Sequence, residues 1–304
     1  MGTSWSVKTS SDTGYDAELN HAIQSELDLV DNLMSNWRDD SDISRFNLSE
    51  LNSCTEVSMP TLAVVLLAQR ISSLSEGAFD ISIGPLIDLW GFGTETLDGD
   101  EAPDGEEIKK VLETTGIEHM YLTDTELCKR NTPLQLNVSG LAKGYAVDRV
   151  ANLLNEQGFN NYLVEVGGEL RGQGVNGRGK VWTVGVEQPN DELGANQVVT
   201  AVQLRDAAVA TSGDYRNFYT LENQRYSHII DPIKGYPVTH SAASVTVLAS
   251  TSIEADAWAT ALLVLGPEKG IKIADQKGLA VLMILRNTEG FNTVTSESWS
   301  KSLN

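Results

Sequence analysis

The sequence predicts an α+β fold, with mostly antiparallel sheets flanked by helices. Segments with helical periodicity and short strand-like segments are mixed along the 304 residues without strict alternation, which argues against a doubly wound parallel sheet. Hydrophobic residues make up 41% of the chain and charged residues 21%, proportions typical of a globular protein. No low-complexity tract or linker interrupts the chain, so we expect a single domain over residues 1–304.

Helices are predicted where apolar residues recur every three or four positions. The clearest case is segment 15–35, whose periodic residues are Leu19, Ile23, Leu27, Val30 and Leu33. Pro60 suits the first turn of a second helix over 60–74, because proline has no N–H to lose there. Further helices are expected at 106–115, 144–158, 253–265 and 267–276.

Strands are predicted where short apolar or β-branched runs lie between turn residues. Segment 77–86 is strand-like and then breaks at its glycine and proline. The other expected strands are 120–122, 126–129, 134–138, 162–166, 181–186, 198–204, 208–211, 218–221, 244–249, 279–284 and 293–296. The polar segment 37–47 is left without a predicted element.

The net charge narrows the possible partners. Lys and Arg number 22 and Asp and Glu number 42, which gives −20. Such a surface repels polyphosphates, so we expect no nucleic-acid partner, and an anionic membrane surface is disfavoured for the same reason. The chain has no apolar run long enough to cross a membrane.

The two cysteines, Cys54 and Cys128, lack metal-ligand spacing. We expect them to be unpaired or buried thiols, with a disulfide between them as the alternative.

Asp256 and Thr260 are the first candidate site residues. Their i, i+4 spacing places a carboxylate and a hydroxyl on one helix face. Both offer hard oxygen ligands, which suit Mg²⁺ or Ca²⁺ rather than Zn²⁺. The alternative is an Asp in a first helical turn, where it complements the helix dipole.

A second candidate is the segment 137–148, in which a strand gives way to a glycine-bearing turn and a helix. Such a turn can present backbone N–H groups to a phosphate, and Lys143 adds a positive charge. The spacing is not that of a Walker A motif, and an ordinary helix start is the alternative.

The third candidate is His228, which lies close to the turn residues that follow it and could transfer a proton there. A structural histidine is the alternative. The turns at 165–169 and 211–215 place glycines at strand ends, where a ligand could approach the backbone.

Together these segments resemble the flavin transferase (ApbE) family of FAD:protein FMN transferases, essentially from end to end. The residues that carry the resemblance are Met1-Gly2-Thr3, Ser41–Asn47, Phe79–Leu86, Leu89–Gly93, Ala142–Tyr145, Thr211–Tyr215, Ser227–Pro232 and Ala255–Thr260. The resemblance implies one compact ApbE-like unit that performs Mg²⁺-dependent transfer of FMN from FAD, its substrate, to a Thr or Ser hydroxyl of an acceptor flavoprotein, with release of AMP.

The resemblance also implies roles for individual residues. Asp256, Thr260 and the carbonyl of Gly140 fall where the family binds the metal, and His228 falls at the catalytic position. The positions that contact FAD in the family are here Met1, Trp37, Ala78, Phe79, Asp80, Asn137, Lys143 and Ile230. Two positions depart from the common pattern: many members have Asp where Asn137 stands and Tyr where Trp37 stands. The amide of Asn137 can still hydrogen-bond but brings no charge.

The resemblance implies acceptors among the subunits of respiratory redox pumps, such as the sodium-translocating NADH:quinone oxidoreductase. It also implies a periplasmic protein, anchored to the inner membrane in its full-length precursor. Two alternatives remain. Water could attack in place of the acceptor at the same residues, which would make the protein an FAD pyrophosphatase. The protein could also bind flavin without turnover, but such a carrier needs no metal site, so Asp256, Thr260 and His228 argue against it.

Overall fold

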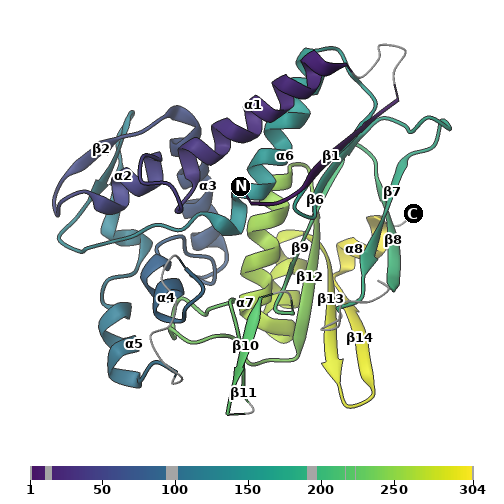
Figure 1. The fold of residues 1–304 in the computed structure, drawn as a ribbon. Coiled ribbons are helices and arrows are strands. Elements are labelled where there is room, and N and C mark those ends of the chain that lie inside the picture. The colour runs from purple at the N-terminus through teal and green to yellow at the C-terminus, as the bar shows by residue number, and fades with distance from the viewer. Residues whose placement is uncertain are drawn as a thin grey trace. The chain divides into compact units, whose positions relative to one another are not determined.

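The computed structural model describes residues 2–10, 16–93, 102–189, 197–215, 217–222 and 224–302 (Figure 1). The chain forms two compact units, each built from separated segments. The first comprises Met1–Val30, Leu141–Tyr215 and His240–Asn304, and the second Asp31–Gly140 and Arg216–Thr239. The single domain expected from the sequence stays a prediction.

The first unit is built on a seven-stranded sheet, counted over the described residues, in which each neighbouring pair is antiparallel. The strands, in spatial order, are β1 (Trp5–Thr9), β5 (Tyr162–Val166), β6 (Glu169–Gln173), β9 (Ala207–Gly213), β12 (Ala242–Ala249), β13 (Ala280–Asn287) and β14 (Gly290–Thr295). A separate antiparallel pair joins β7 (Trp182–Glu187) to β8 (Val198–Leu204). The prediction of an α+β fold with mostly antiparallel sheets is confirmed.

Two layers cover the sheet of the first unit. The long helix α7 (Ser252–Lys277) packs against β9 and β12. On the other face a buried cluster joins the sheet to β7, β8 and α8 (Glu297–Ser302), and it includes Trp182, Leu204, Leu282 and Trp299. The backbone of α7 breaks at Gly266, where φ is 74°, directly before Pro267. This break agrees with the two helices predicted from the sequence.

The start of α7 is held by α6 (Ser139–Glu156). The buried carboxylate of Asp148 accepts hydrogen bonds from the backbone N–H groups of Ser252 and Ile253, at 3.0 and 2.9 Å. A Cβ atom at Gly144 would lie only 2.3 Å from the carbonyl oxygen of Ser252, so this close approach of the two helices requires glycine. The contact brings Lys143 and Asp256 into one site.

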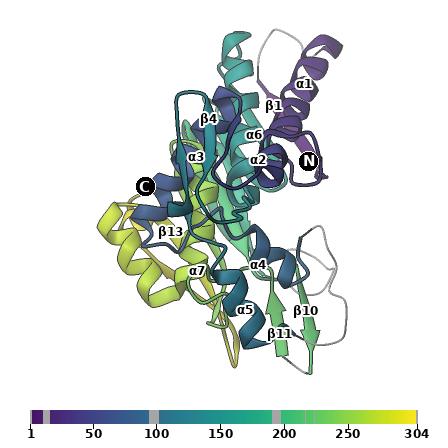
Figure 2. The same ribbon diagram turned by 90° about the vertical axis from the view of Figure 1, so that its left-hand side faces the viewer.

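In its described residues, the second unit contains several helices and two small sheets. The helices are α2 (Asp42–Leu48), α3 (Met59–Leu74), α4 (Gly84–Leu89), α5 (Gly105–Leu112) and the 3₁₀ turn Ile117–His119, while α1 (Ala17–Met34) begins in the first unit. β2 (Cys54–Glu56), β4 (Glu126–Lys129) and β3 (Met120–Leu122) form an antiparallel sheet, and β10 (Phe218–Leu221) pairs with β11 (Gln224–Ser227). Helices α4 and α5 lie beside this hairpin (Figure 2).

Two predicted strands of the second unit are wrong. Segment 77–86 contains turns and the start of α4, because the Asp80 carboxylate accepts the N–H of Ser82 at 2.7 Å and bends the chain before Gly84 and Pro85 begin the helix. Segment 134–138 makes only a single bridge, Gln135 to Ile83. The polar segment that carried no prediction contains α2, whose N-cap, Ser41, accepts the N–H of Ser44.

The expectation of unpaired thiols is also wrong. Cys54 and Cys128 lie directly opposite each other on β2 and β4 and form a disulfide. Their pairing depends on strand register across 74 residues of chain, which no local spacing reveals.

Among the described residues, no helix combines the length and apolar content needed to cross a membrane.

Candidate functional site

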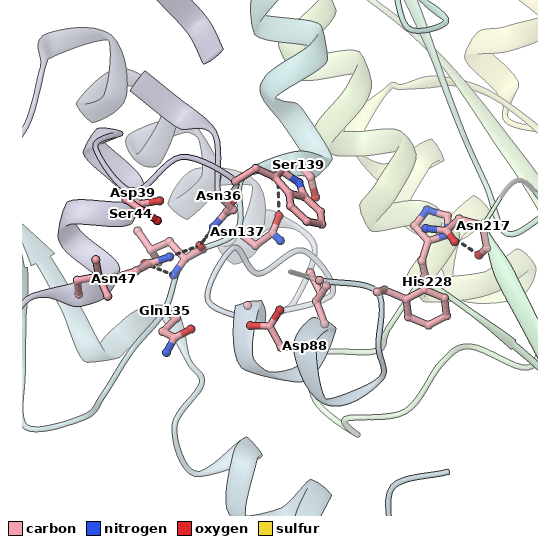
Figure 3. Close-up of a pocket in the computed structure, with 17 residues that line it drawn as sticks. Asn36, Asp39, Ser44, Asn47, Asp88, Gln135, Asn137, Ser139, Asn217 and His228 are labelled. Atoms are coloured by element: carbon pink, nitrogen blue, oxygen red, sulfur yellow. Dashed lines mark hydrogen bonds between the residues drawn. The ribbon is translucent and has the colours of Figure 1, made fainter. Parts of the chain in front are cut away.

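A pocket of about 410 Å³ lies within the second unit (Figure 3). Its lining combines hydrogen-bonding side chains with a few apolar ones. The lining residues are Asn36, Trp37, Asp39, Ser44, Asn47, Leu48, Gly84, Ile87, Asp88, Phe92, Gly93, Gln135, Leu136, Asn137, Ser139, Asn217 and His228. Such a mixture suits a ligand with both ring faces and polar edges. Three residues predicted from the sequence, Trp37, Asn137 and His228, therefore share one pocket.

His228 has a fixed orientation in this pocket. Its Nδ1 atom lies 2.9 Å from the carbonyl oxygen of Asn217, and its backbone N–H donates to the same oxygen at 3.1 Å. The ring of Phe92 meets the imidazole edge-on, with centroids 6.2 Å apart. A carbonyl oxygen can only accept, so Nδ1 carries the hydrogen and the neutral ring keeps its lone pair on Nε2. This tautomer is the one a general base requires.

Asn137 and Trp37 are placed differently in the pocket. The Asn137 side-chain oxygen accepts the N–H of Ser139 at 3.0 Å, at the first residue of α6. The backbone N–H of Asn137 donates to the carbonyl oxygen of Ile81. The Trp37 side chain is 73% exposed, an unusual position for so large an apolar group. An exposed indole beside a pocket is available to stack on a planar ligand.

Other predicted FAD contacts do not line the pocket. Ala78 and Phe79 are buried, and the half-buried Asp80 uses its carboxylate to accept the N–H groups of Ser82 and Ile117. Burial raises the pKa of Asp80, and these hydrogen bonds oppose the rise. Ile230 is buried in a cluster with Leu86, Trp90 and Ile108. Met1 lies outside the described residues.

In the first unit the structure brings together Lys143 and Asp256, and it adds Glu169. Lys143 Nζ lies 2.6 Å from Glu169 Oε1 and 3.8 Å from Asp256 Oδ1. The other oxygen of Asp256 accepts the backbone N–H of Gly144 at 3.0 Å. One turn farther along α7, the Thr260 hydroxyl lies 3.1 Å from the Ser212 hydroxyl.

When its carboxyl groups are ionised, this cluster carries more negative than positive charge. Asp256 and Glu169 are each 2% exposed, and one ammonium lies between them. Desolvation and the charge of Asp256 raise the pKa of Glu169 to about 7, and desolvation raises that of Asp256. The second carboxylate oxygen of Glu169 is buried without a hydrogen-bond partner among the described residues. The site therefore lacks positive charge.

The donors in this cluster fit a hard divalent cation. Asp256 supplies a carboxylate, Thr260 supplies a hydroxyl, and the excess negative charge favours a cation over an anion. Gly140 lies in the other unit, and its part in a metal site stays a prediction. Elsewhere in the described chain, Cys54, Glu126 and Cys128 lie close enough to share a metal, but the disulfide occupies both sulfur atoms.

Glu169 was missed as a site residue. It follows the turn at Gly167 and Gly168, and the glycines had pointed to this turn as a place where a ligand could approach. No spacing rule links it to Lys143 or Asp256.

The comparisons with known proteins cover nearly the whole chain. The model of the ApbE family matches residues 1–283. A protein of Escherichia coli (strain K12) named FAD:protein FMN transferase is 39% identical over 308 residues, covering 100% of this chain and 87% of that protein. A Klebsiella pneumoniae (strain 342) protein of the same name is 40% identical over 298 residues, covering 96% of this chain and 84% of the relative.

Solved structures agree with the sequence relatives. The flavin transferase ApbE from Vibrio cholerae superimposes with a TM-score of 0.91 at 39% identity, covering 100% of this chain and 96% of that one. The apo form of the Pseudomonas stutzeri flavinyl transferase ApbE gives 0.89 at 36% identity, covering 100% and 94%. The chain belongs to the ApbE family.

Proposed function

We propose that the protein transfers FMN from FAD to a Thr or Ser hydroxyl of an acceptor flavoprotein. The observation that supports this most directly is the end-to-end similarity to relatives named FAD:protein FMN transferase, at 39% identity over 308 residues. The pocket with its oriented histidine and the buried carboxylate cluster supply the two kinds of group that this reaction needs.

In the proposed reaction the acceptor oxygen attacks the phosphorus of the FMN half of FAD. A new ester bond forms between the acceptor and FMN, the diphosphate P–O bond breaks, and AMP leaves with the bridging oxygen. His228 Nε2 takes the hydroxyl proton, because the hydrogen bond from Nδ1 to Asn217 leaves the lone pair on Nε2. Trp37 stacks on a ring of the ligand, and Asn137 offers its amide to a polar edge.

The cluster of Lys143, Glu169, Asp256 and Thr260 in the first unit acts on the diphosphate of FAD. We propose that Asp256 and Thr260 hold Mg²⁺, which when bound draws charge from the phosphate oxygens. Lys143 contributes a second positive charge, and Glu169 holds its ammonium in place through the 2.6 Å contact. We retain Gly140, Ala78, Phe79, Asp80, Ile230 and Met1 as proposed contacts that the family resemblance implies.

We propose the periplasm as the compartment and a subunit of a respiratory redox pump, such as the sodium-translocating NADH:quinone oxidoreductase, as the acceptor. The disulfide between Cys54 and Cys128 supports the first part, because disulfides persist in oxidising compartments such as the bacterial periplasm.

The test measures AMP release from FAD with and without a purified recombinant acceptor subunit of that pump, each in Mg²⁺ or in EDTA. We expect AMP only with Mg²⁺ and much faster with the acceptor, which gains covalent flavin. AMP and FMN formed at one rate regardless of acceptor would instead identify an FAD pyrophosphatase. FAD binding with no AMP in any arm would identify a flavin carrier.

A further inference from the structure

Lys129, the last residue of β4, is a buried cation in the second unit. Lys129 is 3% exposed, and within the described part of the chain its ammonium has no carboxylate partner. Desolvation lowers its pKa to about 8. Burying an unpaired charge is costly, so the contacts that hold the ammonium must compensate.

The Lys129 ammonium binds the end of α2. It donates to the carbonyl oxygens of Asn47 at 2.8 Å and Ser49 at 3.2 Å, and it lies 5.1 Å from the centre of the Phe46 ring. The last carbonyls of a helix have no partner within the helix and carry partial negative charge. Lys129 therefore fixes both the position and the direction of the final turn of α2.

Asn47 links the end of α2 to the pocket. Its side-chain amide donates to the carbonyl of Leu136 at 2.9 Å, and its side-chain oxygen accepts the N–H of Leu136 at 2.7 Å (Figure 3). Asn36 donates to the same carbonyl at 2.7 Å. The main chain of Asn47 is thus held by Lys129, while its side chain holds Leu136.

The segment held in this way forms one wall of the pocket. Gln135, Leu136 and Asn137 all line it, although they belong to no strand. Lys129 does not line the pocket. The segment has no strand ladder: its main chain meets residues 81–83 through the bridge of Gln135 to Ile83 and the N–H of Asn137 bonded to Ile81. The main-chain groups of Leu136, which lies between them, are instead held by side chains, and two of those hydrogen bonds come from Asn47.

We propose that Lys129 is a positioning residue for the flavin pocket: by fixing the end of α2 it sets Asn47, which holds the wall formed by residues 135–137. The identity of the ligand as FAD rests on the proposed function. The effect on the wall itself does not, because it concerns contacts within the protein.

A double-mutant cycle tests whether Lys129 acts through Asn47. FAD affinity is measured by calorimetry in EDTA, where no turnover occurs, for the wild type, Lys129→Met, Asn47→Ala and the double variant. We expect each single change to weaken FAD binding about tenfold, the loss of about one to two hydrogen bonds. The double variant should be little weaker than either single one, because the two changes break one connection.

Two further readouts separate positioning from simple destabilisation. Hydrogen exchange of the Leu136 amide should be faster in Lys129→Met, and KM for FAD should rise while kcat stays near the wild-type value. The control is Ile71→Ala, which removes a buried side chain of α3 in the same unit and should lower stability without changing either readout. If Lys129→Met does not fold, Lys129→Gln, which keeps a donor, replaces it and should show a smaller effect.

Additive effects on FAD affinity, or unchanged exchange at Leu136 in a folded Lys129 variant, would overturn the inference. The exchange readout uses the protein alone, so it stands even if the wild type releases no AMP. Failure of the proposed function and failure of this inference are thereby distinguished.

Discussion

The Nδ1 atom of His228 lies 2.9 Å from the main-chain carbonyl oxygen of Asn217. This contact assigns the tautomer of the neutral ring, because the carbonyl cannot donate a hydrogen. The backbone N–H of His228 donates to the same oxygen, so a single residue holds both ring and main chain. The geometry leaves Nε2 as the atom that can accept a proton.

His228→Ala should therefore lower kcat for FMN transfer by about 10²–10⁴-fold, the usual contribution of a general base. FAD affinity should change little, because the pocket keeps its polar lining. The measurement is AMP release at saturating FAD and acceptor. His119→Ala is the matched control, since His119 contacts the Thr132 hydroxyl and does not line the pocket. An unchanged rate in His228→Ala would remove the histidine from the mechanism.

Asp256→Asn should weaken Mg²⁺ binding at least about tenfold, because it removes a charged ligand from a buried site. Titration calorimetry with Mg²⁺ alone measures this without turnover. Glu268→Gln removes an exposed carboxylate from the same helix and should bind Mg²⁺ like the wild type. Equal affinity in Asp256→Asn and the wild type would place the metal elsewhere.

Glu169 should make the stability of the metal-free protein depend on pH. Desolvation is the main cause that raises its pKa from 4.5 to about 7. Between these values the folded protein holds a proton that the unfolded chain lacks, so this group's contribution to the free energy of unfolding falls as pH rises from about 4.5 through 7. Urea unfolding of the wild type and Glu169→Gln at several pH values isolates the effect as their difference. Parallel pH profiles would contradict it.

Removing the disulfide should lower stability. The link between Cys54 and Cys128 closes a loop across 74 residues of chain, and constraining such a loop in the unfolded state is worth about 2–4 kcal/mol. Urea unfolding with and without a dithiol reductant measures the loss, with the Cys54→Ser, Cys128→Ser double variant as the control that reductant should not affect. A wild-type protein whose stability does not respond to complete reduction would refute this prediction.

The sequence was sufficient to predict the fold class and the long helices, because apolar periodicity in α1 and the Gly266-Pro267 break are local signals. Four strands, β1, β2, β6 and β11, were not predicted. β1 is only five residues long; Trp5 and Val7 alternate with polar residues, but none of its residues is buried, so its signal is weak. β6 contains only one large apolar residue, Leu170, and its pairing with β5 and β9 is set by register.

Two residues of the candidate site and its surroundings, Glu169 and Lys129, could not be predicted from local sequence patterns either. Asp256 and Thr260 share a helix face, and their i, i+4 spacing indicates a pair of metal ligands from the sequence alone. Glu169 and Lys129 acquire their roles from contacts across 26 and 82 residues of chain, Glu169 with Lys143 and Lys129 with Asn47. Such contacts follow from how strands and helices pack, so a single sequence holds no spacing that reveals them.

The central claim is that FMN passes to a protein hydroxyl rather than to water. The most direct measurement is the intact mass of the acceptor subunit after incubation with the enzyme, FAD and Mg²⁺, with AMP quantified in the same sample. The account predicts an acceptor heavier by one esterified FMN, in a one-to-one ratio with AMP. Free FMN and AMP in equal amounts, with the acceptor mass unchanged, would contradict it.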